Sequence, residues 1–542
     1  MRLKKIKVAN HSRLQDFELE VRDHLVLVGS NDVGKSSLLR CLDLLLGSSA
    51  AQLYNRLEPD DFRDTELPLQ IEATLETFTP LEKAAFPDEI HVEGQGSELK
   101  LNLQLEATLD NGENLEIRRI AGNSTGRQLS RDQLVVLGWK SVGALQSASR
   151  DFREDRNSVL KEILSAVELG EEAESLGELA EQFQAGLTSS KVLAGIRNDL
   201  AVQLSKAVPV PISANELSFV TNARAADDLL AEVQLRVNRD GREHSLAEQS
   251  DGARALIALA LYDLVSSSAN IVAIDEPEIH LHPTSQRSLA KLLKRGDNQK
   301  ILATHSPDIV GAFAPEDIVV VRKGGQIAQP RIGFLDAEAK LMVHWWVKDK
   351  LEPLTSAVVI LVEGASDRIL VERVAELLNK DLDRLGVSLM EMDGSGDVKY
   401  IRALFGPSGF EIPTRVLIDR DAVSKAAPEF GVAAEALEDD GALEAKGVFV
   451  SQCDLEDEYV AAVGAERMWQ VIEGSSLFSN NERALCVATD QDQQRSNADI
   501  AAFCRHKKRK IRSAIMVVDI LTVEEASKIA SVVRLLESLN KA

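Results

Sequence analysis

The chain has 542 residues, too many for a single hydrophobic core, so about two to four domains are expected. Its net charge of −24 argues against a protein that coats DNA through a generally basic surface. The sequence contains no run of about 18 apolar residues, so no membrane span is predicted. The basic start lacks the apolar stretch of a signal peptide. The four cysteines form no CxxC pair, which suggests neither a zinc site nor a disulfide framework. We therefore expect a cytoplasmic protein without a membrane partner.

A glycine-rich segment near the start has the sequence and the surroundings of a P-loop. Residues 29–36 read GSNDVGKS, follow the apolar run 24–28 and precede a helix predicted over 37–46. In such a loop, glycines allow backbone N–H groups to surround phosphates, the lysine reaches the β- and γ-phosphates, and the serine ligates Mg²⁺. The segment predicts an ATP site with these contacting residues: Asn31, Gly34, Lys35, Ser36 and Ser37.

A second apolar strand, 270–274, runs directly into Asp275 and Glu276. Acids at the C-terminal end of a buried parallel strand are typical of an ATPase, where Asp275 would position Mg²⁺ and Glu276 would orient or activate the attacking water. Alone, the pattern is equally typical of a strand that ends in exposed acids. The P-loop earlier in the chain favours the catalytic interpretation.

Further segments resemble parts of an ABC-type ATPase. Residues 246–254, LAEQSDGAR, resemble the ABC signature, in which Ser250 and Gly252 would meet the γ-phosphate of a nucleotide held by another module. Asp251 departs from the usual pattern there. His305, after an apolar strand, resembles the switch histidine that contacts the γ-phosphate. The string 276–283, EPEIHLHP, resembles the segment at the interface of SMC-like ATPases, so its HxH is not interpreted as a metal site. Gln146 is the candidate for the Q-loop glutamine of an ABC-type ATPase.

The composition changes after residue 150. Residues 158–204 are rich in Ala, Leu, Glu and Gln, with apolar residues three and four positions apart, which predicts two or three amphipathic helices. This segment has too few residues for a long SMC-type coiled coil. A dimerisation insert is the preferred interpretation, and a plain packing hairpin is the alternative. The expected division is an ATPase domain over 1–150 and 210–335, the helical insert over 151–209, a linker over 336–355, and a second α/β domain with terminal helices over 356–542.

In this second domain, strands and helices alternate, which predicts a parallel sheet. Apolar strands end at Glu363, at Asp419 and Asp421, and shortly before Asp454 and Glu456. Because the C-terminal ends of parallel strands converge on one crevice, these carboxylates are expected to meet. Such a cluster requires compensating cations, and oxygen-only ligands favour Mg²⁺ or Mn²⁺ over zinc. Two such ions can activate a water and stabilise the leaving oxygen of a phosphodiester.

A strand that ends in Glu363-Gly364, followed by one that ends in Asp419-Arg420-Asp421, resembles the Toprim domain of topoisomerases, primases and OLD nucleases. Together with the ABC-type ATPase and its short insert, the chain resembles the OLD (overcoming lysogenization defect) family over nearly its whole length. That family includes the Gabija nuclease component, and its members act in phage defence or phage competition.

The resemblance implies an α/β fold in which an ABC-type P-loop ATPase with a helical insertion precedes a Toprim domain with terminal helices. It implies that Glu363, Asp419 and Asp421 hold one metal ion. It also implies that Asp367 and Glu456, with Asp454 as a further candidate, hold a second. Lys510 is the best match for a family lysine that stabilises transition-state charge. The implied partners are DNA, a second copy in a homodimer or a dimer of dimers, and a helicase encoded nearby.

The expected function is an ATP-binding, Mg²⁺- or Mn²⁺-dependent DNA endonuclease or nickase. The basic run 505–510, RHKKRK, is either a DNA-facing patch or a solvated helix face. The alternative function is a non-cleaving SMC-like ATPase that senses or organises DNA, although long heptads are absent. A topoisomerase is disfavoured because none of the tyrosines stands in a recognisable strand-passage domain, and a primase would not need this ATPase.

Overall fold

The structure is a computed structural model, and the chain divides into two compact units, Met1–Val136 with Ile301–Ala542, and Leu137–Lys300. Within the described part of the chain, no helix has the length and apolar character needed to cross a bilayer. The described residues are 1–92, 98–110, 114–122, 128–142, 172–195, 198, 236–239, 242–245, 269–279, 281–336, 351–392, 398–489 and 494–539.

The first unit opens with an antiparallel sheet in the order β2-β1-β4-β6-β5, in which β7 also pairs with β6. Along β4 every second residue is buried, as expected for a sheet with one face on the core. Helix α1 (Lys35–Leu46) packs against β4 and β6. The strands are β1 (Arg2–Ala9), β2 (Phe17–Glu20), β4 (Leu69–Glu76), β5 (His91–Val92), β6 (Leu99–Asp110) and β7 (Asn114–Ala121). The short helices here are α2 (Ala50–Arg56), α3 (Pro80–Ala85) and α4 (Arg131–Leu137).

The predicted P-loop strand is present as β3 (Leu25–Val28), and all four of its residues are buried. It pairs in parallel with β12 (Gln299–Ala303) on one side and β13 (Ile318–Val321) on the other. Strand β13 in turn pairs with β14 (Ile327–Ala328) in the antiparallel direction. Because parallel strands buried on both faces have no polar side, these segments are continuous apolar runs in the sequence. The C-terminal end of β3 leads into the P-loop, and that of β12 leads to His305 before α12, Pro307–Val310.

In the second unit, β8 (Trp139–Val142) pairs in parallel with β11 (Ile271–Asp275), so the predicted acid-bearing strand is confirmed. Helix α7 (Glu172–Ser189) confirms helical structure in part of the predicted insert. The ABC-signature residues Ser250 and Gly252, the candidate Gln146 and most of the predicted linker lie outside the described residues. The remaining elements are β9 (Arg236–Arg239), β10 (Arg242–Ser245) and α11 (Pro283–Arg295).

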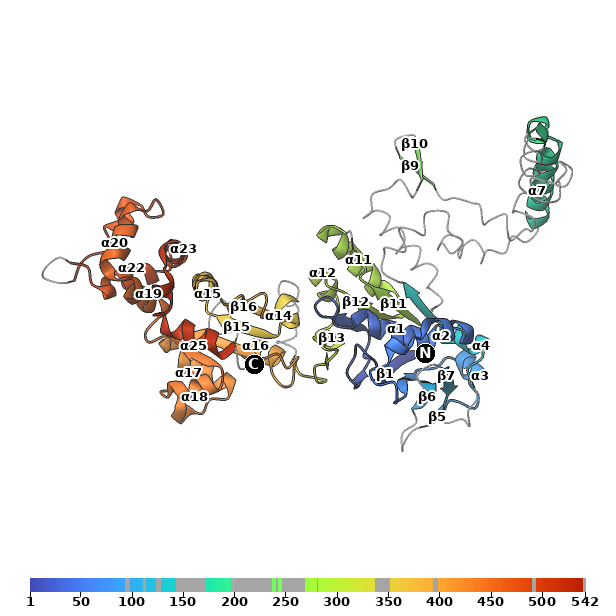
Figure 1. Cartoon of the computed structure of the whole chain (residues 1–542), viewed down its shortest axis with the longest axis horizontal. Helices are drawn as coiled ribbons and strands as arrows, with labels where there is room; N and C mark the ends of the chain where they lie inside the picture. The colour runs from blue at the N-terminus through green and yellow to red at the C-terminus, as the bar shows by residue number, and fades with distance from the viewer. Residues whose placement is uncertain are drawn as a thin grey trace. The chain divides into compact units, whose positions relative to one another are not determined.

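The later part of the first unit contains the predicted parallel sheet, with strand order β16-β15-β17-β18 (Figure 1). All three pairings are parallel, which confirms the expectation from alternating strands and helices. The strands are β15 (Val358–Val362), β16 (Val387–Glu391), β17 (Thr414–Ile418) and β18 (Val448–Val450). The helices among them are α14 (Leu351–Thr355), α15 (Ala365–Leu377), α16 (Val398–Phe405), α17 (Val423–Ala426) and α18 (Asp440–Ala445).

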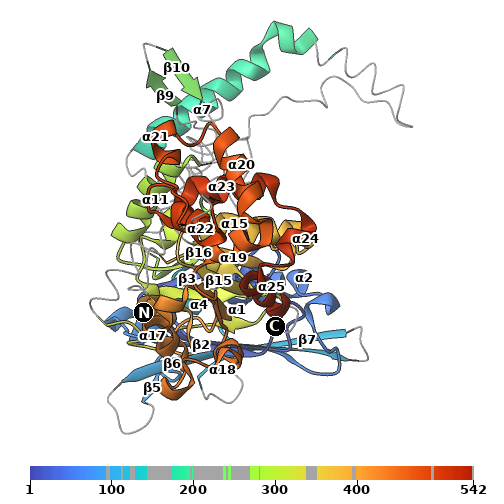
Figure 2. The ribbon, with the colours of Figure 1, turned by 90° about the vertical axis from the view of Figure 1, so that its left-hand side faces the viewer.

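A helical region follows this sheet and shares a hydrophobic core with it. Helix α23 packs along α15, and both views show the two side by side (Figures 1 and 2). Fully buried Leu370, Val460 and Val517 are part of this core. The helices are α19 (Leu455–Val463), α20 (Ala465–Gly474), α21 (Asn480–Arg483), α22 (Asn497–Arg505), α23 (Lys510–Ile520), α24 (Val523–Ala526) and α25 (Ala530–Ser538).

The basic run 505–510 does not form one helix face. Arg505 is the last residue of α22, Lys510 is the first residue of α23, and residues 506–509 connect the two helices. Arg509 is buried, whereas His506, Lys507 and Lys508 are exposed. The helix-face alternative for this run is therefore wrong, because its residues are divided between two helix ends and a turn.

Candidate functional site

Lys35 of the P-loop is held by the backbone around it. Its Nζ donates hydrogen bonds to the carbonyl oxygens of Gly29, at 3.1 Å, and Ser30, at 2.8 Å. The same nitrogen lies 2.7 Å from Nε2 of His305. Because an ammonium group can only donate, Nε2 of His305 accepts this bond and the imidazole is neutral. The structure thus brings together the lysine and the histidine that the sequence assigned to the γ-phosphate.

The shape of the P-loop depends on two glycines. Gly34 has φ 112°, and a Cβ there would lie 2.7 Å from the Leu14 side chain. A Cβ on Gly29 would lie 2.3 Å from the carbonyl oxygen of Val321. A side chain at Gly29 would clash with the end of β13 and one at Gly34 would clash with Leu14, so both positions require glycine. Of the remaining predicted residues, Asn31 and Ser36 are exposed and Ser37 is half-buried.

In the other unit, Asp275 is the half-buried last residue of β11 and Glu276 follows it with φ 47°. This left-handed backbone is uncommon for a residue with a side chain and is often found at functional turns. His282 caps helix α11, where its Nδ1 accepts a hydrogen bond from the backbone N–H of Thr284 at 3.4 Å. His280, the other histidine of this HxH, lies outside the described residues.

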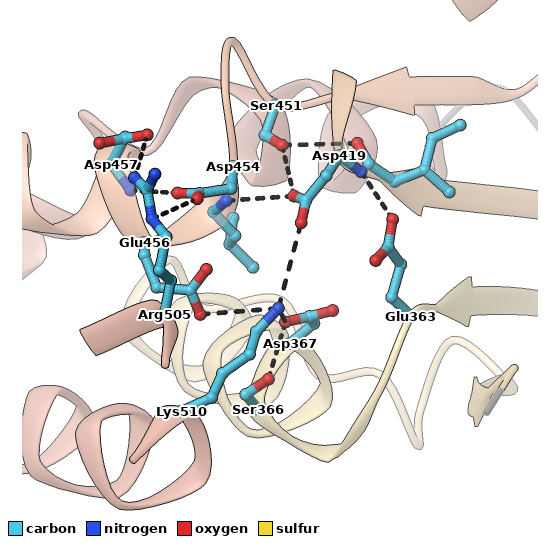
Figure 3. Close-up of polar contacts among 12 residues, drawn as sticks. Glu363, Ser366, Asp367, Asp419, Ser451, Asp454, Glu456, Asp457, Arg505 and Lys510 are labelled. Carbon is cyan, nitrogen blue, oxygen red and sulfur yellow. Dashed lines mark hydrogen bonds and ion pairs between the residues drawn. The ribbon is translucent and has the colours of Figure 1, made fainter. Parts of the chain in front are cut away.

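The strand-end acids of the parallel sheet do meet at one place (Figure 3). Glu363, Asp419 and Asp421 each offer an oxygen within 4.8 Å of the other two. Glu363 Oε1 also accepts a hydrogen bond from the backbone N–H of Asp419, at 2.9 Å, which ties the end of β15 to the end of β17. We refer to these three residues together with Asp367 and Glu456 as the carboxylate centre.

Asp419 is held rigidly by groups that the sequence reasoning missed. Its Oδ1 accepts hydrogen bonds from Ser451 Oγ, at 2.8 Å, and from the backbone N–H of Leu455, at 3.2 Å. Ser451 directly follows β18, so the strand-end rule that found the acids would also have found this hydroxyl. A second such hydroxyl, Ser366 Oγ, donates to Asp367 Oδ1 at 2.9 Å.

Lys510 extends from the start of α23 into the same centre. Its Nζ lies 3.5 Å from Asp367 Oδ1, 3.6 Å from Glu456 Oε1 and 4.0 Å from Asp419 Oδ2. Glu456 is almost completely buried, and its Oε2 has no hydrogen-bond partner among the described residues. The structure therefore brings Lys510 and three of the predicted carboxylates together from four separate elements.

The carboxylate centre holds its acids in an environment that disfavours their negative charge. Burial raises the pKa of Glu363 and Asp419, and it raises the pKa of Glu456 to about 7. Burial alone would lower the pKa of Lys510, but nearby Asp367, Glu456 and Asp419 raise it. Buried carboxylates that resist ionisation beside a cation are typical of a site that binds further cations.

Asp454, expected as a further metal ligand, has a different set of contacts. Its Oδ1 caps α19 by accepting the backbone N–H of Asp457 at 2.9 Å. Its Oδ2 lies 2.8 Å from Nε of Arg505, which also lies 2.7 Å from Asp457 through its Nη2. Burial raises the pKa of Asp454 to about 6. The arginine that the sequence grouped with a DNA-facing patch thus pairs with acids at the start of the helix that carries Glu456.

Two protein families match the chain in succession. Residues 25–311 match AAA_21, described as an AAA domain, and residues 354–421 match the TOPRIM domain of overcoming lysogenization defect protein-like proteins. The second range includes Glu363, Asp367, Asp419 and Asp421. The predicted order of an ATPase domain followed by a Toprim domain is confirmed.

Several known proteins are similar over most of the chain. The OLD nuclease of Thermus scotoductus is 23% identical over 453 residues, covering 77% of this chain and 82% of that protein. The endonuclease GajA of Bacillus cereus is 21% identical over 443 residues, covering 74% and 73%. Among solved structures, the C-terminal region of the Burkholderia pseudomallei OLD protein is 27% identical, with a TM-score of 0.29, and covers 34% of this chain and 98% of that one.

The AAA_21 match spans more than half of the chain, and the OLD-like match lies on the strands that carry the carboxylate centre. The chain therefore belongs to the AAA_21 family, and it joins this ATPase domain to an OLD-like Toprim domain.

Proposed function

We propose that this protein is an ATP-hydrolysing, divalent-metal-dependent DNA endonuclease or nickase of the OLD type, acting in phage defence. The observation that carries the proposal is the carboxylate centre with Lys510 inside it. Burying several carboxylates together costs free energy, so an acid cluster without a catalytic role would be more stable in solvent. Similarity to proteins named OLD nuclease and endonuclease GajA gives independent support.

The donor set of the centre fits Mg²⁺ or Mn²⁺. All of the side chains offer carboxylate oxygens, and the buried Glu456 Oε2 has no hydrogen-bond partner among the described residues. Glu363, Asp419 and Asp421 would hold one ion, and Asp367 and Glu456 would hold a second. Two ions bound there would activate a water and stabilise the leaving oxygen of a phosphodiester.

The protein's own groups would orient this chemistry. The bonds from Ser451 and the Leu455 N–H to Oδ1 of Asp419 leave its Oδ2 turned toward Lys510. Lys510 would stabilise the negative charge that develops on the attacked phosphate. Asp454 would act through its contacts with Arg505 and the first turn of α19 rather than as a metal ligand.

For the ATPase, Lys35 would bind the β- and γ-phosphates and Ser36 would ligate Mg²⁺, with Asn31, Gly34 and Ser37 completing the loop. Asp275 would position the ion, and Glu276 would orient the attacking water. His305 would contact the γ-phosphate, and Ser250 with Gly252 would reach it from a second copy. The ABC-type parts thus imply a homodimer or a dimer of dimers, with the insert over 151–209 as the dimerisation segment and the Toprim domain over 356–542. A helicase is a further proposed partner.

The test is cleavage of supercoiled plasmid in Mg²⁺ or Mn²⁺, with and without ATP, by the wild type and by Asp419→Ala, Lys35→Ala and Asp383→Ala. Asp383 is an exposed acid of the same domain and serves as the matched control. Wild type and Asp383→Ala are expected to nick or linearise the plasmid, and Asp419→Ala is expected not to. The Lys35→Ala variant shows whether nucleotide permits or restrains cleavage.

The alternative function is a non-cleaving SMC-like ATPase that senses or organises DNA. It is favoured if the wild type hydrolyses ATP but leaves plasmid intact under every metal and nucleotide condition. Cleavage that persists unchanged in Asp419→Ala would contradict the Toprim assignment, because it would have to arise elsewhere.

A further inference from the structure

The carboxylate centre contains a single identified cation, the ammonium group of Lys510, among acids from three different elements. Asp367 comes from α15, Glu456 from α19, and Asp419 follows β17 (Figure 3). All three lie 3.5 to 4.0 Å from Lys510 Nζ. A lysine in this position supplies the positive charge that lets the acids lie close together.

The ammonium is a poor match for these oxygens. A charge-assisted N–H···O bond has a nitrogen–oxygen distance of about 2.7–2.9 Å, and none of the three contacts is that short. The side chain of Glu456 is only 2% exposed, yet its Oε2 has no hydrogen-bond partner among the described residues. Lys510 is therefore held by the summed field of the acids, without a directional bond that would resist its departure.

A second metal ion would compete with Lys510 in this position for the same carboxylate oxygens. Asp367 and Glu456 would hold this ion through Oδ1 and Oε1, the oxygens that lie 3.5 Å and 3.6 Å from Lys510 Nζ. Two positive charges that close together in a largely buried site repel strongly, and they compete for the same oxygens. The ion can therefore bind well only if the ammonium moves away.

We propose that Lys510 is an exchangeable counter-cation, which occupies the position of the second metal ion until that ion displaces it toward the DNA phosphate. This inference rests on the proposed function and deepens it. The same lysine would compete with the second ion for the carboxylates and would contact the DNA phosphate once that ion is bound. Lys510 is the first residue of α23 and its side chain is 25% exposed, so a path toward solvent is open to it. A centre with one ion would then keep its lysine away from the substrate.

The exchange is tested by metal binding without DNA or nucleotide. Mn²⁺ binding is measured by isothermal titration and by electron paramagnetic resonance for the wild type and for Lys510→Met, Asp367→Asn, Asp419→Ala and Lys508→Met. Asp367→Asn identifies the second ion, whose binding it should remove. Lys508 is exposed and near in sequence, so Lys508→Met controls for the loss of one charge.

At a pH at which Glu456 is ionised in both proteins, Lys510→Met is expected to strengthen binding of the second Mn²⁺ by about tenfold or more, because a nearby positive charge is gone, and to abolish cleavage. Lys508→Met is expected to change that affinity less than about twofold, because an exposed charge is screened by solvent. Second-ion affinity that is unchanged or weaker in Lys510→Met would overturn the exchange. A wild type that binds no Mn²⁺ sensitive to Asp419→Ala would instead contradict the proposed function itself.

A measurement on the wild type covers the case in which Lys510→Met does not fold. Reductive methylation of lysines, followed by mass spectrometry, is compared without Mn²⁺ and with saturating Mn²⁺. Displacement predicts that Lys510 becomes severalfold more accessible to the reagent while Lys508 does not change. Equal or lower labelling of Lys510 in Mn²⁺ would show that the ammonium stays among the carboxylates.

Discussion

The protein places two lysines at the first residue of a helix, and their surroundings differ in kind. Lys35 begins α1, where its identified partners are the carbonyl oxygens of Gly29 and Ser30 and the neutral imidazole of His305. Lys510 begins α23, where its partners are three carboxylates. The bonds from Lys35 to these carbonyl oxygens hold its ammonium group in the P-loop, where a phosphate would bind. The acids at Lys510 create a demand for cations that one ammonium cannot satisfy.

The largest effect that would sharpen this comparison is expected from Lys35→Ala. Loss of the ammonium removes charge-assisted bonds to phosphate, so ATP affinity should fall by about 100-fold or more. Mn²⁺ binding at the carboxylate centre should change little, because that centre uses a different lysine. Both are measured by titration, with a fluorescent ATP analogue and with Mn²⁺. Loss of Mn²⁺ binding in Lys35→Ala would mean that the two lysine sites are not independent.

The next largest effect is expected from His305→Ala. His305 accepts a hydrogen bond from Lys35, and its proposed role is to contact the γ-phosphate. ATP hydrolysis should slow by about 10- to 100-fold, while ATP affinity should weaken less than about threefold, because Lys35 keeps its own contacts with phosphate. Steady-state hydrolysis and nucleotide titration separate the two quantities, and His506→Ala, which removes an exposed histidine, is the control. Equal losses of affinity and rate would assign His305 to ground-state binding only.

An effect of about tenfold on cleavage is expected from Arg505→Gln. Arg505 pairs with Asp454 and Asp457 at the start of α19, so its loss should loosen the turn that carries Glu456. The expected signature is a lower kcat with an unchanged KM for DNA and with two Mn²⁺ ions still bound. If Arg505 contacts DNA instead, KM and its salt dependence would change while kcat stays the same. Lys507→Gln removes an exposed charge nearby and is the control.

These variants also mark how far the sequence alone could predict the site. Glu363, Asp419 and Asp421 could be predicted from the sequence because each follows an apolar strand. Strand ends in a parallel sheet converge whatever the details of packing. The contacts of Arg505 could not be predicted from the sequence. They depend on how α22 packs against α19, and no local pattern encodes that packing. Asp454 was a candidate ligand from its place after an apolar strand and from the family resemblance, whereas its two oxygens contact the Asp457 N–H and Arg505.

The same limit applies to the fold. The strands β3, β11, β15 and β17 were predictable because a strand buried on both faces is a continuous apolar run. The structure of the basic run 505–510 could not be predicted, because charge alone does not distinguish an exposed helix face from the turn between α22 and α23.

The smallest effect is a pH dependence that should be present at the carboxylate centre and weak at the P-loop. Burial raises the pKa of Glu456 to about 7, so this acid is protonated below pH 7 and an incoming ion must displace the proton. The affinity for the second Mn²⁺ should therefore fall by about fivefold between pH 7.5 and pH 6, and change little above pH 8. Titrations in buffers of different ionisation enthalpy should show proton release that accompanies binding of the second ion.

Two variants separate the sources of this pH dependence. Glu456→Gln should flatten the profile, because the titrating group is gone. Lys510→Met should move the midpoint to higher pH, because the ammonium lowers the pKa of Glu456 and its removal leaves the effect of burial unopposed. A profile that is flat in the wild type would mean that Glu456 is ionised before the ion arrives. The second ion would then bind without releasing a proton from Glu456.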